Sequence, residues 1–554
     1  MGAEHRKARA GVGSAKVKDS VPTLRRGPAT WPLHPFLFAA ASVVALYASN
    51  LREMSFAAAV PVVAAAVGVA AALFLSVGAL MRDFGPRPAV FTSVVLVAAL
   101  YHEALFGRLN WLLGGAFPAG AALPLTLLIA GAIAVVTLRA RFDLTLANAV
   151  LNGIAIVVFA TPTWTAASYA IETASLRQPL AVAASAHPTE PVGGAVAAPS
   201  AASTPDIYYF IFDRYASQQT LARVYDFDNR PIASFLRAKG FYVALESHAN
   251  YPKTAPSLAS TFRMDYLDFL VDRPLAERNE WHPIYDMLQH HRVGAFLKSR
   301  GYRFVQIGSW WAPTQGSAAA DESYSFGLSE FAWLYLRRTI LPKVLDAALP
   351  TTGLARMTAW DNGQCRRVPL QFEAAKAVAA RPEPTFTFVH VLLPHEPYVF
   401  DADGGCLSPI DAQERGNERG YLDQLQYANS LIRDVVESLL ARPDRPIIIL
   451  QADEGPYPEA YRTGNRSWTI ATPDELATKT GILNAYYFPE GDYSALYQEI
   501  TPVNTFRLLF DKYFGTGFGR LPDRIFAFPD YSQIYDFFDV TDAARQGHRP
   551  EEED

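Results

Sequence analysis

The stretch Pro205-Asp-Ile-Tyr-Tyr-Phe-Ile-Phe-Asp213 decides the fold of the C-terminal part of this chain. Every residue from Ile207 to Phe212 is β-branched or aromatic, and an acidic residue follows directly. A run without alternating polar residues is typical of a strand that is buried on both faces. The stretch therefore predicts a core strand of an α/β domain.

Strand and helix patterns alternate along the chain after this stretch. Further strands are expected at Phe241–Leu245, Gly301–Ile307, Thr385–Leu393 and Pro446–Gln451, with helical patterns between them. This alternation predicts a mostly parallel central sheet with helices on both faces. Ligands of such sheets bind at the carboxyl ends of the strands.

The chain before this domain is rich in long apolar runs. Of its 554 residues 50% are hydrophobic and 19% are charged, and the apolar excess lies between Trp31 and Ile171. The runs are Pro32–Ala48, Phe56–Leu80, Ala89–Leu105, Pro118–Leu138 and Leu144–Ile171. Each is near the ~20 residues that cross a bilayer core. We expect a helical membrane domain at 31–175 with about five helices, four or six being the alternatives.

Basic residues predict the orientation of this domain. Lys and Arg gather in residues 1–30, a predicted disordered tail, and in the loops Arg82–Pro88 and Arg139–Asp143. Basic loops stay in the cytoplasm. The sequence therefore predicts a multi-pass protein of the bacterial inner membrane, with a cytoplasmic N-terminus and a periplasmic or extracellular C-terminal domain. A cleaved signal peptide is disfavoured, because one apolar run follows another.

The remaining boundaries follow from composition. Residues 176–204 contain no Phe, Tyr or Trp and are rich in Ala, Pro and Ser, which predicts a flexible linker. The α/β domain is expected at 205–540 and a charged, frayed tail at 541–554. Net charge of -5 gives no reason to expect nucleic-acid binding. Cys365 and Cys406 form either a disulfide or two unrelated thiols, since pairing depends on the fold.

Acidic residues follow two of the predicted strands. Asp213 ends the first strand, and Asp453 and Glu454 follow the strand that ends at Gln451. Any one of them could be only a turn former or a helix cap. Together they could hold one metal ion at the edge of the sheet. His390, in the middle of a predicted strand, is expected to be a satisfied core histidine.

A hydroxyl residue precedes a predicted helix at Ala255–Phe262. Thr254 lies in the turn-rich stretch Asn250–Thr261. A helix N-terminus binds phosphate or sulfate oxygens, and a hydroxyl beside a divalent metal can become a nucleophile. The alternative is that Thr254 only caps the helix.

Several stretches carry a family resemblance: PDIYYFIFDRYAS, NYPKTAPSLAS, HVLLPHEPYVFD, IIILQADEGP and ILNAYYFP. With them, the chain from about 205 to 514 resembles the sulfatase-like branch of the alkaline phosphatase superfamily. The helical anchor with an outer domain also resembles lipoteichoic acid synthases and phosphoethanolamine transferases.

The resemblance implies a role for each candidate residue. Asp213 would be a metal ligand, Thr254 a nucleophile that also touches the metal, and Asp453-Glu454 would stand at the family's Asp-His ligand pair. His395 would bind the substrate or protonate the leaving oxygen. The chain departs from the sulfatase signature at Thr254, at Leu258 in place of Arg, and at Glu454 in place of His.

These departures bear on the cofactor and the reaction. A site of Asp213, Thr254, Asp453 and Glu454 offers only oxygen, which favours one Mn²⁺, Mg²⁺ or Ca²⁺ over Zn²⁺. The resemblance implies a membrane-anchored, metal-dependent hydrolase or phosphoryl-type transferase acting on a lipid head group or an envelope glycan among membrane lipids. A catalytically inactive domain with a binding or assembly role in the envelope is the alternative. Substrate and oligomeric state are left open.

Overall fold

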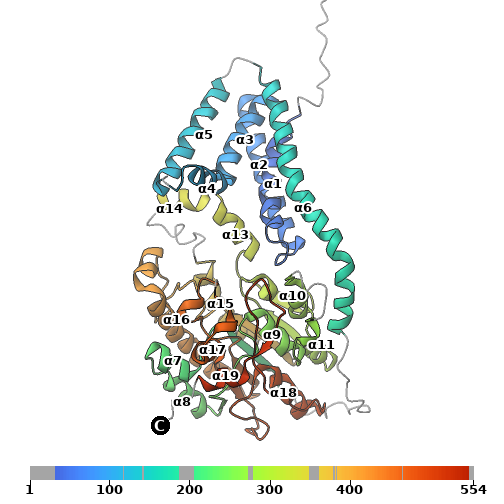
Figure 1. Ribbon diagram of the computed structural model, residues 1–554, viewed down its shortest axis with the longest axis vertical. Coiled ribbons are helices and arrows are strands. Elements are labelled where there is room, and N and C mark those ends of the chain that lie inside the picture. The colour runs from blue at the N-terminus through green and yellow to red at the C-terminus, as the bar shows by residue number, and fades with distance from the viewer. Residues whose placement is uncertain are drawn as a thin grey trace, which may run out of the picture.

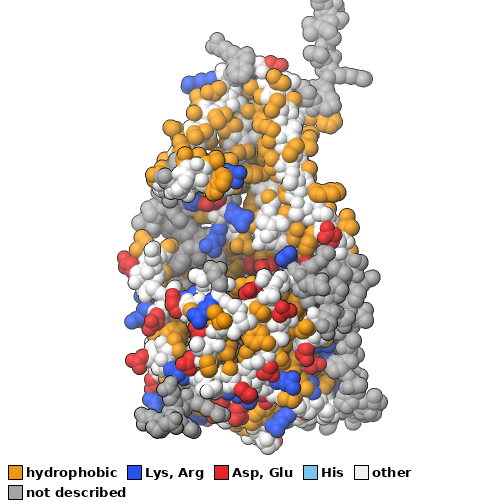
Figure 2. Space-filling view, viewed as in Figure 1, with side chains coloured by type: hydrophobic (Ala, Val, Ile, Leu, Met, Phe, Trp, Pro, Cys, Tyr) orange, Lys and Arg blue, Asp and Glu red, His pale blue; other side chains and the backbone are white. Residues whose placement is uncertain are grey.

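A computed structural model describes residues 31–115, 118–139, 143–185, 205–271, 279–348, 361–378, 381, 383–464 and 466–547. They form a helical part and an α/β part that follow each other along the long axis of the molecule (Figure 1). Hydrophobic side chains cover much of the helical part, whereas acidic and basic side chains are scattered over the α/β part (Figure 2). The predicted N-terminal tail lies outside the described residues.

The helical part contains the predicted apolar runs. Its helices are α1 (His34–Ala48), α2 (Phe56–Met81), α3 (Pro86–Leu100), α4 (His102–Leu112), α5 (Ala122–Arg139) and α6 (Thr145–Ser185). By length and composition, three helices of the described chain can cross a membrane, namely α2, α5 and α6. The pair α3 and α4, bent by 68°, makes a fourth span if it is taken as one. The described residues thus support three to four spans instead of about five, because α1 is short and the third run breaks at Tyr101.

Two helices extend beyond the boundaries that the sequence predicts. Helix α6 runs to Ser185, into the segment predicted as a flexible linker, because this segment contains Leu and Ala, which favour helix. Residues 186–204 lie outside the described residues. Helix α19 (Thr541–Gln546) occupies part of the predicted frayed tail. Its residue Ala544 is fully buried, since α19 packs on α17 (Pro473–Thr480).

The α/β part contains a seven-stranded sheet in the order β2-β7-β6-β1-β5-β3-β4. Strand β7 is antiparallel to both of its neighbours, and the other pairs are parallel. The strands are β1 (Ile207–Phe212), β2 (Tyr242–Val243), β3 (Arg303–Ile307), β4 (Glu322–Tyr324), β5 (Thr385–Val391), β6 (Ile447–Gln451) and β7 (Asn484–Tyr487). The predicted mostly parallel sheet is confirmed. A separate ribbon joins β8 (Phe526–Ala527) and β9 (Phe538–Asp539).

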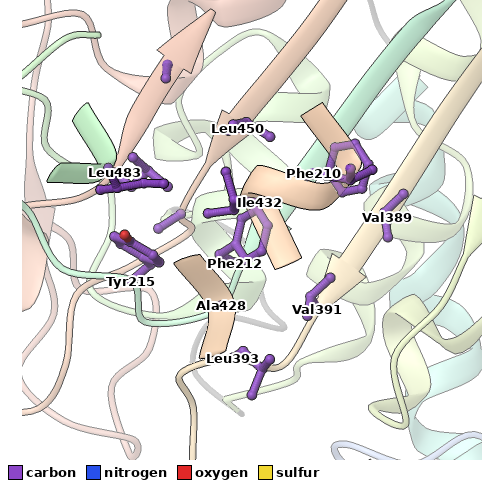
Figure 3. Close-up of a cluster of buried hydrophobic side chains, with 14 of the residues drawn as sticks. Phe210, Phe212, Tyr215, Val389, Val391, Leu393, Ala428, Ile432, Leu450 and Leu483 are labelled. Carbon is purple, nitrogen blue, oxygen red and sulfur yellow. The ribbon is translucent and has the colours of Figure 1, made fainter. Parts of the chain in front are cut away.

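Helices cover both faces of this sheet. Those not yet named are α7 (Gln218–Tyr225), α8 (Arg230–Ala238), α9 (Thr254–Arg263), α10 (His282–Gln289), α11 (Arg292–Ser299), α12 (Ala312–Gln315), α13 (Glu330–Arg338), α14 (Leu341–Ala348), α15 (Gln364–Val378), α16 (Pro409–Leu440) and α18 (Thr505–Phe514). Alternate residues of β1 point to opposite faces. Phe210 and Phe212 join one core with α15 and α16 (Figure 3), and Tyr209 joins the other with α9 and α18. The continuous apolar run of β1 is explained by burial on both sides.

The two parts also pack against each other. Phe331 and Tyr335 of α13 are buried in one cluster with residues of α1 and α2. The hydroxyl groups of Tyr335 and Ser42 are 2.8 Å apart, and Ile340 N–H donates to the Ala99 carbonyl at 2.8 Å. The α/β part is therefore attached to the helical part by tertiary contacts as well as by the chain.

Candidate metal centre and nucleophile

Three neighbouring strands in the middle of the sheet bring three ligand-type side chains together. Asp213 follows β1, His390 lies near the end of β5, and Asp453 follows β6. One ligand atom of each lies within 4.8 Å of the others, and all three residues are buried. His390 Nε2 is 3.6 Å from Asp213 Oδ2. The predicted convergence of Asp213 and Asp453 at the edge of the sheet is thus present.

The unpartnered atoms of these residues fit a bound cation. Within the described chain, Asp213 Oδ1, His390 Nε2 and Asp453 Oδ2 are buried and have no hydrogen-bond partner. A buried polar atom without a partner costs free energy and calls for an explanation. Carboxylate oxygens and an imidazole nitrogen are the donors that divalent ions take in proteins. The residues therefore fit one divalent metal ion.

His390 was predicted to be a satisfied core histidine, and this is wrong for one of its nitrogens. Its Nδ1 is 2.7 Å from Thr314 Oγ1, while Nε2 is left facing Asp213. The apolar pattern of β5 concealed this role because the strand is buried on both faces. The available signal was position, since His390 lies near the carboxyl end of the strand.

Thr254 is close to the same group. It is the first residue of α9, and its side chain lies near enough to the Asp453 carboxylate to lower the pKa of that group. Ser257 Oγ donates to the Asp453 carbonyl at 2.6 Å, which fixes the helix against the turn after β6. The N-cap residue of α9 is Lys253, so the capping alternative for Thr254 does not describe this helix.

Charge around the carboxylates shifts their pKa values in opposite directions. Burial works to raise the pKa of Asp213, but His395, His390 and Arg214 outweigh it and hold the pKa below its usual range. Burial raises the pKa of Asp453, and the neighbouring charge of Asp213 adds to the rise. Two carboxylates in one buried site disfavour each other's ionisation, which a bound cation would relieve.

Glu454 lies in an ion-pair network. Its Oε1 accepts from Arg214 Nε at 3.1 Å and from Lys479 Nζ at 2.9 Å, and all three side chains are buried. Burial lowers the pKa of Lys479 to about 8, against the opposing effect of Glu454. Glu454 Oε2 has no partner among the described residues. Glu454 is not one of the three converging residues, and its ligand role stays a prediction.

His395 lies on the loop after β5. Its Nδ1–H donates to the Glu396 carbonyl, and its own carbonyl accepts from Gln424 Nε2 at 2.8 Å. Burial lowers the pKa of His395, and the positive charge of Arg214 lowers it further. Both effects favour the neutral form of the ring.

Arg214 joins this site to a polar cleft of about 160 Å³. Its guanidinium pairs with Glu396 and lies 4.7 Å from the centre of the Tyr457 ring. Tyr398 and Arg462 also line the cleft. The sequence analysis missed Arg214 and Lys479, although Arg214 directly follows Asp213.

Comparison with known proteins identifies the domain. A protein-family model described as Sulfatase matches residues 228–508, just over half of the chain. The match includes Thr254, His390 and Asp453, whereas Asp213 precedes it. No curated protein sequence matches this chain.

Three solved structures are similar to the α/β part. The C-terminal periplasmic domain of EcEptC from Escherichia coli is 12% identical over 61% of this chain and 93% of its own, with a TM-score of 0.39. Its complex with Zn is 12% identical over 60% and 95%, with a TM-score of 0.38. The soluble domain of lipooligosaccharide phosphoethanolamine transferase A from Neisseria meningitidis is 12% identical over 58% and 92%, with a TM-score of 0.37.

Proposed function

Because the chain belongs to the sulfatase family of the alkaline phosphatase superfamily, we propose that it is a membrane-anchored, metal-dependent phosphoryl-type transferase or hydrolase with Thr254 as nucleophile. The observation that carries the proposal is the convergence of Asp213, His390 and Asp453, with Thr254 beside Asp453 at the first position of α9. A nucleophile beside a cation site is what group transfer to a hydroxyl needs.

Each residue has a distinct part in the proposed reaction. Asp213, His390 and Asp453 would hold one divalent ion, which when bound lowers the pKa of the Thr254 hydroxyl and offsets charge on the transferred group. Thr254 Oγ1 loses its proton to water and bonds to phosphorus, while the bond from phosphorus to the leaving oxygen breaks. An alcohol or water then attacks phosphorus and releases Thr254.

His395 suits the second half of this reaction. Its Nδ1–H is engaged by the Glu396 carbonyl, and its pKa is lowered. A neutral ring in this tautomer presents Nε2 as an acceptor. We therefore favour a role in binding the incoming hydroxyl and taking its proton over protonation of the first leaving oxygen.

The identity of the metal is affected by His390. Mn²⁺, Mg²⁺ or Ca²⁺ were favoured over Zn²⁺ because only oxygen ligands were expected. An imidazole nitrogen removes that preference and suits Zn²⁺ or Mn²⁺. We propose that one of these two ions occupies the site.

The membrane helices support a substrate at the bilayer surface. With the basic loops in the cytoplasm, the domain would lie in the periplasm. The disulfide between Cys365 and Cys406 agrees with an oxidising compartment. A lipid head group or an envelope glycan is therefore the proposed substrate.

Replacing Thr254 tests the proposal. We expect T254A to reduce release of diacylglycerol from fluorescent phosphatidylethanolamine vesicles at least about a thousandfold, because the nucleophile is lost. The control T254S retains a hydroxyl and should retain activity and a phosphorylated residue at position 254. Wild-type-like turnover by T254A would exclude Thr254 as nucleophile.

A non-catalytic envelope protein is the competing proposal. It is favoured by Glu454, which stands where the family has a His ligand and which pairs with Arg214 and Lys479. Metal content of the purified protein separates the two. If the protein binds no Zn²⁺ or Mn²⁺ and its melting temperature does not rise when these ions are added, the binding role is favoured.

A further inference from the structure

The helical part contains an elongated apolar cavity of about 470 Å³. Its walls come from α3, α4, α5 and α6, with Phe38 of α1, and its volume is within the range of roughly 300–1,000 Å³ that ligand pockets have. Helix α4 is bent away from the axis of α3 by 68°, next to the cavity. Leu105 and Ile129 line the cavity and are also about half exposed, so it opens sideways toward the surrounding bilayer.

The length of the cavity matches one leaflet of a membrane. Its α5 wall runs from Ala122 to Ile133, which is about 16 Å along a helix. A bilayer core is about 30 Å thick, so one leaflet is about half of that. Helix α5 begins at Ala122, and the end of α5 beside α4 and α14 faces the α/β part (Figure 1). The cavity therefore spans the leaflet that faces the α/β domain.

A buried histidine of α4 contacts Thr126 on the wall of the cavity. His102 is 1% exposed, and its Nδ1 is 2.9 Å from Thr126 Oγ1 on the cavity wall. Its Nε2 has no hydrogen-bond partner among the described residues. His102 itself is not among the residues that line the cavity, so its contact with Thr126 holds α4 against α5 at this wall.

Charged side chains lie on or against α4, which forms one wall of the cavity. Arg108 of α4 stands between the lining residues Leu105 and Leu109 and lies 4.6 Å from the Trp111 ring. Lys343 of α14 pairs with Glu103 of α4. A lipid phosphate would find one available cation on α4, Arg108, because Lys343 is already paired with Glu103.

We propose that this cavity binds one acyl chain of an ester-linked phospholipid from the leaflet facing the α/β domain. The chain lies between α3, α4, α5 and α6, and the phosphate lies on the side of Arg108. The proposal does not depend on Thr254 or on the metal centre. It assigns the membrane domain a lipid site in addition to its anchoring role.

Filling the cavity tests this site. Ala130 lines the cavity, whereas Ala132 of the same helix is exposed and does not. A130F would displace about three methylenes of the chain, at about 0.8 kcal/mol each. The affinity for a spin-labelled phosphatidylglycerol should fall roughly fiftyfold, which is about 2.4 kcal/mol. A132F adds the same side chain outside the cavity and should bind like wild type.

A second measurement on the unaltered protein keeps the proposal testable if A130F misfolds. Full-length protein in phosphatidylethanolamine and phosphatidylglycerol vesicles is irradiated with a phospholipid that carries a diazirine on its acyl chain. We expect the label on peptides from α4 and α5. An excess of unlabelled phospholipid should abolish it. Equal affinity of A130F and A132F, or label spread evenly over all helices, would overturn the proposal.

Discussion

The sequence suggests Glu454 as a metal ligand and His390 as a core residue, but in the structure His390 is the better candidate ligand. Glu454 follows Asp453 in a run that resembles a ligand pair, yet its Oε1 is bonded to Arg214 and Lys479. His390 has an unpartnered Nε2 beside two carboxylates. The charge of a carboxylate with two cationic partners is already neutralised. A metal ion therefore gains less binding free energy from it than from a ligand atom that has no partner.

This difference predicts opposite effects on metal binding. H390A should lower the affinity for Zn²⁺ or Mn²⁺ roughly a hundredfold or more, because a ligand is lost. E454Q should bind metal within a few-fold of wild type. Isothermal titration calorimetry on the full-length protein measures both. Equal losses in the two variants would restore Glu454 as a ligand, as the sequence suggested.

Among the elements, α13 connects the two parts of the chain and contains a carboxylate sensitive to pH. Glu330 accepts from Ala312 N–H at 3.0 Å. Burial raises the pKa of Glu330 from 4.5 to about 7, the Ala312 hydrogen bond opposes this, and Glu53 of the α1–α2 loop adds to the rise. The folded protein therefore holds this proton at a higher pH than the unfolded chain does.

The raised pKa of Glu330 makes the folded protein less stable as pH rises. The contribution of Glu330 is complete below pH 4.5 and is lost as pH rises to about 7. After allowance for its partial exposure, the loss is about 2 kcal/mol. The melting temperature of the wild type should therefore fall between pH 4.5 and about 7. E330Q should remove most of this fall, whereas E246Q, at an exposed carboxylate, should not. A decline in E330Q equal to that of wild type would refute the assignment.

Element boundaries differ in how far the sequence predicted them. The strands β1, β5 and β6 were expected within a few residues, because continuous apolar runs need burial on both faces. The extension of α6 to Ser185 and the burial of α19 were not expected. The composition of a segment indicates whether it can build a hydrophobic core of its own. A helix that packs on another element needs fewer apolar residues.

At the scale of the whole molecule, one covalent link closes a long loop of the α/β part. Cys365 of α15 and Cys406, before α16, are joined across 41 residues. The sequence left this pairing open, since distance in the fold decides it. A cross-link stabilises mainly by restricting the unfolded chain.

Removing this link should weaken the fold. For a loop of this length the expected loss in the free energy of unfolding is about 4 kcal/mol. The double variant C365S/C406S should melt at a lower temperature than wild type, and wild type treated with reductant should match it. A variant as stable as the oxidised protein would show that the link contributes nothing.

The sequence by itself determined the apolar helical part, the alternation of strands and helices, and the placement of Asp213 and Asp453 at strand ends. These follow from local patterns, because burial on one or two faces sets the spacing of apolar residues. Only the tertiary structure decided that His390 lies beside the two carboxylates and that Glu454 forms ion pairs with Arg214 and Lys479. The same holds for the cavity between α3, α4, α5 and α6. Such contacts depend on strand order and helix packing between distant segments, which the spacing of residues within each segment does not specify.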